Sequence, residues 1–184
     1  MKDPESERKE ILGRLEEAVV LLEGTDPRLV LPGGLFIGYA IRGARDAGGI
    51  AALRPGICPG KKTQPAEGAV TFGADAQIAR IIITTMKFDP AVRSAAMVRF
   101  SAASVAVLEA MFLDCATFDP ARVRQGISTM DWGVASCCRE GVPDVIYTRD
   151  YPGTEGIIRI LGEDPVVVAN NILILSNRVL HSEL

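Results

Sequence analysis

The sequence Phe72-Gly73-Ala74-Asp75-Ala76-Gln77-Ile78-Ala79-Arg80 contains a glycine turn that leads directly into a helix. Residues 69–72, just before the turn, are typical of a short strand. The residues after it repeat at helical spacing on one face, namely Ile78, Ile81, Ile82, Thr85 and Met86. A strand–turn–helix junction directs backbone N–H groups outward at the helix start, which favours an anion there. This junction is therefore the first candidate for a functional site.

Outward from this junction, strand-like and helix-like segments alternate along the chain. Strand patterns occur at residues 35–40, 49–53, 96–100, 115–118, 144–147 and 157–161, and helical patterns occupy much of the remainder. An aspartate before a proline predicts helix starts at Asp89, Asp119 and Asp164. Strands alternating with helices predict an α/β fold, in the form of a three-layer α/β/α sandwich.

The length of 184 residues predicts a single structural unit with a substantial core. Residues 1–30 are expected to form an N-terminal helix that packs on the domain. This helix starts at Asp3-Pro4 and carries an apolar stripe that includes Ile11 and Leu15. Residues 31–184 are expected to form the α/β/α domain.

Composition and charge exclude several classes of function. The net charge is −3 and no basic block or aromatic–basic alternation occurs, which disfavours nucleic-acid binding. The charged N-terminus has no signal-peptide core, and the longest apolar run, at residues 172–175, is too short for a membrane span. We therefore expect a soluble cytoplasmic protein that contacts neither nucleic acid nor membrane.

The cysteines and the single histidine further restrict the chemistry. The four cysteines have no CxxC spacing, which favours free thiols in a reducing compartment. His181 is the only histidine and lies near the C-terminus, so we expect no zinc site. Histidine acid–base catalysis is also disfavoured, unless the C-terminal tail folds back or reaches a neighbouring subunit.

A collinear set of segments resembles the ThiN domain, the archaeal-type thiamine-phosphate synthase that is often fused behind a hydroxymethylpyrimidine kinase. The matching segments are residues 72–74, 93–101, 129–133, 143–147, Gly153, Glu155 and 158–162. The resemblance covers roughly residues 31–180. It implies a fold of the aldolase/epimerase (AraD/HMP-PK C-terminal-like) class. It also implies a transferase of thiamine biosynthesis that joins hydroxymethylpyrimidine diphosphate to thiazole phosphate and releases pyrophosphate. Neither a kinase domain nor a DNA-binding module is recognisable, so we expect a stand-alone domain.

The resemblance also shows which site residues differ. The family has Gly-Arg-Ile before the central strand and Ser-Ser-His after Phe-Gly-Ala, and this arginine and histidine are tied to catalysis. Ile57 and Gln77 occupy those positions here. Two family asparagines are replaced by Phe36 and Met97, and a lysine by Thr154. We therefore predict weak or lost catalysis.

Several polar residues remain as candidates for ligand binding. They are Gly73, Asp75, Gln77, Arg80, Arg99, Asp150, Gly153 and Glu155, with Lys61 and Lys62 as candidate phosphate ligands. Some of them also have a simpler interpretation: Asp75 as a helix N-cap, the lysines as solvated loop residues, and residues 150–155 as a solvated turn. No metal site and no definite cofactor are identified; magnesium is expected only if the domain is catalytic.

Three hypotheses about function remain open. The first is a domain that binds a small phosphorylated ligand of the thiamine pathway, with little synthase activity. The second is an active synthase in which Lys61, Lys62 and a metal ion replace the lost groups. The third is a structural or regulatory oligomer whose pocket is filled by Phe36, Ile57 and Met97. In each case we expect a homo-oligomer.

Overall fold

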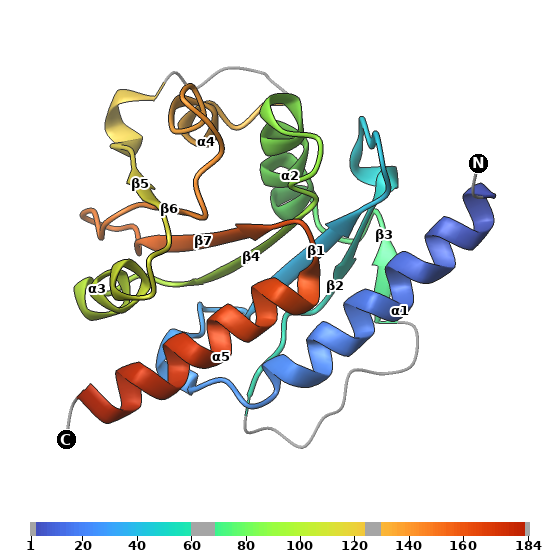
Figure 1. The fold of residues 1–184 in the computed structure, drawn as a ribbon. Coiled ribbons are helices and arrows are strands. Elements are labelled where there is room, and N and C mark those ends of the chain that lie inside the picture. Colours follow the sequence, from blue (N-terminus) through green and yellow to red (C-terminus); the bar gives the residue numbers. More distant parts are fainter. Residues whose placement is uncertain (1–2, 60–68, 124–129, 183–184) are drawn as a thin grey trace.

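The computed structural model describes residues 3–59, 69–123 and 130–182, which form a mixed α/β fold (Figure 1). The helices are α1 (Pro4–Leu22), α2 (Ala76–Phe88), α3 (Ala102–Ala110), α4 (Trp132–Ser136) and α5 (Pro165–Ser182). The strands are β1 (Phe36–Ala40), β2 (Ile50–Leu53), β3 (Val70–Phe72), β4 (Ser94–Arg99), β5 (Cys115–Thr117), β6 (Val145–Tyr147) and β7 (Ile157–Gly162). Three short 3₁₀ helices are η1 (Pro27–Leu29), η2 (Ala47–Gly49) and η3 (Pro120–Arg122).

Seven strands within the described ranges form one sheet in the order β3-β2-β1-β4-β7-β6-β5. Neighbouring strands are antiparallel except β5 and β6, which are parallel. The ends of the strands form two opposite borders of the sheet, which we call the Arg99 edge and the Arg93 edge. The Arg99 edge contains Phe36, Arg99 and Ile157, and the Arg93 edge contains Ala40, Ser94 and Gly162.

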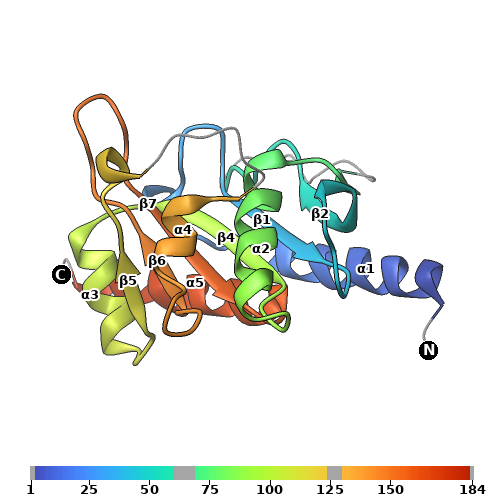
Figure 2. The same cartoon turned by 90° about the horizontal axis from the view of Figure 1, so that it is seen from above.

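Helices cover both faces of the sheet, which confirms the predicted three-layer arrangement (Figures 1 and 2). One face packs against α1, α3 and α5 through a core that includes Leu15, Leu108 and Ile172. The opposite face packs against α2 and α4 through Ile78, Ile82 and Val134. Strand residues alternate between these two cores, as the period of two along a strand requires.

The structure confirms some of the helix starts predicted at aspartate–proline pairs and contradicts others. Asp164 is confirmed as the residue that precedes α5, and its Oδ1 accepts a hydrogen bond from Val166 N at 2.8 Å. The prediction for Asp89 is wrong, because this residue ends α2. Its Oδ1 accepts from Ala91 N at 2.9 Å and so closes a turn into β4. Asp119 starts only the short η3 within the described residues.

The first and last helices pack against each other. Arg14 Nε of α1 donates to Asp164 Oδ2 at 2.8 Å, across 150 residues of sequence. Asp26 N, beyond α1, donates to Ser176 Oγ of α5 at 2.8 Å. Among the described residues, none of the helices combines the length and apolar character needed to cross a membrane.

Candidate functional site

The start of α2 is held by Asp75. Its Oδ1 accepts hydrogen bonds from Gln77 N at 2.9 Å and Ile78 N at 3.0 Å, and the residue is only 9% exposed. These are N–H groups that an anion at a helix start would otherwise bind. Asp75 is thus an N-cap, the simpler of its two interpretations, and its carboxylate disfavours an anion directly at this turn.

The other candidates at this junction are exposed to solvent. Gly73 is exposed, and its φ of +77° reverses the chain after β3, a conformation that suits glycine. Gln77 and Arg80 are exposed on the first turns of α2. Arg54, which the sequence did not single out, donates from Nη1 to Ala74 O at 3.3 Å. A guanidinium group that was not among the predicted candidates therefore lies against the junction.

Ile57 lies on the other side of the sheet. It is 6% exposed and packs in the core shared with α1, α3 and α5, while its backbone exchanges two hydrogen bonds with Leu35. Phe36 and Met97 face the opposite core, beneath α2 and α4. The idea that Phe36, Ile57 and Met97 jointly fill one pocket is therefore wrong, because Ile57 belongs to a different core.

The loop between β6 and β7 lies at the Arg99 edge. Arg99 Nε is 3.8 Å from Glu155 Oε2, so the structure brings these two candidates together. Asp150 Oδ1 accepts from Gly156 N at 2.8 Å, and Gly153, with a φ of +79°, turns the loop. These two carboxylates fit a magnesium site poorly, because one binds a backbone N–H and the other pairs with an arginine. Figure 2 shows the start of α2 on the same side of the molecule as this orange loop.

Arg159 is a residue of this region that the sequence analysis did not select for binding. It lies in β7 opposite Met97 of β4, facing α2 and α4, and is 7% exposed. Its guanidinium carbon lies 5.3 Å from the centre of the Phe118 ring. Burial lowers the pKa of Arg159, while Asp131 raises it. One signal was available: Arg159 is the single charge in the apolar run of residues 157–161.

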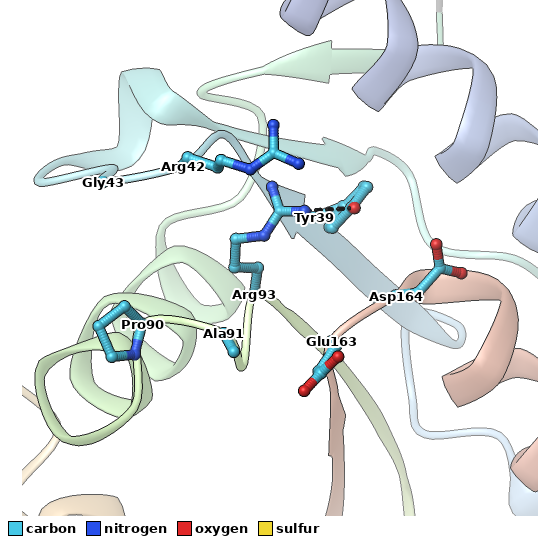
Figure 3. Close-up of a pocket in the computed structure, with 8 residues that line it drawn as sticks. All are labelled: Tyr39, Arg42, Gly43, Pro90, Ala91, Arg93, Glu163 and Asp164. Carbon is cyan, nitrogen blue, oxygen red and sulfur yellow. Dashed lines mark hydrogen bonds between the residues drawn. The ribbon is translucent and has the colours of Figure 1, made fainter.

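A cavity of about 530 Å³ opens at the opposite, Arg93 edge (Figure 3). Arg42, Arg93, Glu163 and Asp164 contribute charged groups to it. Arg93 donates to Ala40 O at 2.9 Å and to Tyr39 Oη at 2.8 Å, and its guanidinium also lies over the Tyr39 ring. Burial raises the pKa of Tyr39, with Arg93 opposing that shift. The polar groups of Arg93 are thus engaged in holding β1 to the start of β4.

The remaining predicted sites give little further information. Lys61 and Lys62 lie outside the described residues. Within the described ranges, no three histidine, cysteine or acidic side chains gather as a metal-binding group. His181 lies at the end of α5, where its Nδ1 is 2.6 Å from Asn177 O.

Two curated archaeal proteins are similar in sequence to this chain. The bifunctional thiamine biosynthesis protein ThiDN of Methanocaldococcus jannaschii is 29% identical over 171 residues, which cover 91% of this chain and 41% of that protein. The thiamine-phosphate synthase ThiN of Methanothermobacter thermautotrophicus is 33% identical over 105 residues, which cover 53% of this chain and 55% of that protein. The chain thus spans about half the length of these relatives or less.

Solved structures support the fold assignment. The C-terminal domain of phosphomethylpyrimidine kinase superposes with a TM-score of 0.79 at 25% identity, covering 92% of this chain and all of that domain. The l-fuculose-1-phosphate aldolase of Thermus thermophilus has a TM-score of 0.50 at 16% identity, with coverage of 93% and 94%. This likeness concerns the fold alone. The family model for thiamine-phosphate synthase ThiN matches residues 14–174, and the chain therefore belongs to the ThiN family.

Proposed function

We propose that this chain binds a phosphorylated ligand of the thiamine pathway and catalyses thiamine phosphate synthesis weakly or not at all. Membership of the ThiN family supports the ligand class. The observation that carries the second part is Gln77, an exposed amide on the first turn of α2 where the family resemblance places histidine. An amide donates and accepts hydrogen bonds but does not carry a proton between reacting groups.

The loss of a positive charge at the other altered position, Ile57, supports the same proposal. Ile57 lies in the core beneath α1, so the side chain there provides no cation to a departing pyrophosphate. The nearest sequence neighbour with a cationic side chain is Arg54, whose guanidinium contacts the carbonyl of Ala74. Binding of an anion by arginines requires only positive charge and donors, whereas turnover also requires groups that act in the transition state.

Titration calorimetry with thiamine phosphate tests the binding. We expect measurable heat that saturates, and no heat at millimolar ligand would overturn this part. Pyrophosphate release from hydroxymethylpyrimidine diphosphate and thiazole phosphate tests the turnover, and we expect a rate close to that without protein.

A fully active synthase is the second candidate, with Lys61, Lys62 and magnesium replacing the lost groups. It predicts rapid pyrophosphate release that magnesium supports and that the double change of Lys61 and Lys62 to alanine abolishes. We further propose that the protein is a cytoplasmic homo-oligomer, which light scattering of the purified chain tests for its subunit number.

A further inference from the structure

Two arginines lie on the same face of the sheet. Arg99 of β4 is opposite Ile157 of β7, and Arg159 of β7 is opposite Met97 of β4. Arg99 and Arg159 are therefore diagonal neighbours on the face beneath α2 and α4, a relationship that places Cα atoms roughly 7–8 Å apart.

The protein groups around Arg159 leave its charge poorly compensated. Its Nε has no hydrogen-bond partner within the described residues, and Nη1 reaches only Ile157 O, at 3.5 Å. Asp131 acts on it through space, and Phe118 offers an aromatic face, but no ion pair forms within the described part of the chain. Among the described residues, the buried Nε of Arg99 also has no hydrogen-bond partner, and the carboxylate of Glu155 is 3.8 Å away.

A buried guanidinium of this kind is costly in free energy. Removing an ion from water is strongly unfavourable even after the protein relaxes, and good hydrogen-bonded pairing is needed to offset that cost. The planar guanidinium group of arginine can donate two parallel hydrogen bonds to two oxygens of one phosphate. Arg159 and Arg99 lie on one sheet face, and among the described residues the Nε of each has no hydrogen-bond partner, so each retains a donor for a phosphoryl group.

We propose that Arg159, together with Arg99, binds the phosphoryl group of the ligand, so that this sheet face selects phosphorylated over unphosphorylated compounds. This inference rests on the proposed function for the identity of the ligand as a thiamine-pathway phosphate. It does not depend on Gln77 or Ile57, because neither lies on β4 or β7.

The test compares wild type, Arg159→Met, Arg159→Lys and the control Arg178→Met. Arg178 is exposed on α5, the helix on the other face of the sheet. Calorimetry measures binding of thiamine phosphate and of unphosphorylated thiamine, and the melting temperature is recorded with and without pyrophosphate. We expect Arg159→Met to weaken thiamine phosphate binding about tenfold or more, as loss of hydrogen bonds to a charged group does. Binding of thiamine and the behaviour of Arg178→Met should match wild type.

The outcomes separate this inference from the proposed function. Wild-type affinity for thiamine phosphate in both Arg159 variants would overturn the inference and leave the proposed function standing. If thiamine phosphate does not bind but pyrophosphate raises the melting temperature only when Arg159 is present, the anion site is supported and the proposed ligand is wrong. If neither compound affects the wild type, both are overturned. If Arg159→Met does not fold, the same binding comparison is made with Arg159→Lys. This variant keeps the positive charge but cannot donate two parallel hydrogen bonds.

Discussion

Gly38 of β1 lies directly beneath Ile78 of α2, and a Cβ added to Gly38 would collide with the Ile78 side chain and come within 3.2 Å of Ile82 Cδ1. We expect Gly38→Ala to lower the free energy of unfolding by about 1–3 kcal/mol, as overpacking of a core does. Urea denaturation measures the change. Gly13→Ala is the matched control, because Gly13 lies within α1 and a Cβ added there would meet no neighbouring element in the described part of the chain. That control should gain about 0.5–1 kcal/mol, and an equal loss in both variants would contradict the packing argument.

Asp75 caps α2 with two hydrogen bonds from one oxygen. Asp75→Ala removes the acceptor and should lower the free energy of unfolding by about 0.5–2 kcal/mol. Asp75→Asn keeps an acceptor of the same shape and should cost less. Chemical denaturation of the three proteins gives the comparison. Equal stability of Asp75→Ala and wild type would show that this cap contributes nothing to the fold.

Gln77→His restores the side chain that the family resemblance places at this position. Since Gln77 is exposed, the free energy of unfolding should change by less than about 0.5 kcal/mol. Pyrophosphate release should rise about tenfold or more, because a positioned acid–base group contributes on this scale. Gln77→Asn is the control and should leave the rate unchanged. If the histidine variant binds both substrates but releases no more pyrophosphate, Gln77 is not what limits catalysis.

The substitution Arg93→Lys tests whether the cavity at the Arg93 edge takes part in ligand binding. Arg93→Lys cannot maintain both hydrogen bonds, to Ala40 O and Tyr39 Oη. We expect a loss of about 1–2 kcal/mol in the free energy of unfolding and an unchanged affinity for thiamine phosphate, because Arg159 and Arg99 lie towards the other end of β4 and β7. A large loss of affinity without a loss of stability would place the ligand in the cavity of Figure 3 instead.

The cysteines should differ in reactivity and in their effect at high pH. Burial raises the pKa of Cys115 and of Cys138 to about 11, whereas Cys58 is exposed. At pH 8 a thiol reagent should modify Cys58 in the folded protein faster than the partly exposed Cys115, and should reach the buried Cys138 only after unfolding. Mass spectrometry of the labelled protein resolves the three sites.

The same burial gives the direction of the pH dependence. Above the ordinary thiol pKa of 9.0, unfolded chains release protons that the folded state retains on Cys115 and Cys138. The free energy of unfolding should therefore fall as the pH rises from 9 towards 11. Cys138→Ala should reduce this fall, and an equally steep fall in the variant would contradict the assignment.

Local patterns in the sequence predicted the elements and their three layers well but not the order in which the strands pair. The β-branched run at residues 157–161 predicts β7, and the spacing of Ile78, Ile81 and Ile82 predicts the buried face of α2. The position of β4 between β1 and β7 depends on pairings between distant segments, which no local pattern contains. The Asp89-Pro90 pair shows the same limit, since a turn that ends a helix and one that starts a helix use similar residues.

The sequence predicted the candidate site only in part, because several of its contacts also depend on pairings between distant segments. The N-cap interpretation of Asp75 follows from its place before a helical pattern and is correct. The contact between Arg99 and Glu155 requires the pairing of β4 with β7, and the burial of Ile57 beneath α1 requires the path of the chain past Leu35. Arg159 appeared only as part of a family motif, because its relation to Arg99 exists only once the strand register is known.

The packing of α1 on α5 has a consequence for biosynthesis. The apolar side of α1, including Ile11, Leu15 and Leu22, packs partly against β1, β2 and β3 and partly against α5, which begins at Pro165. Ribosomes add on the order of ten residues per second, so the part of this surface that α5 covers stays open for on the order of ten seconds while the intervening chain is made. Until α5 is made, the nascent chain therefore exposes part of the apolar side of α1 to aggregation and to chaperone capture.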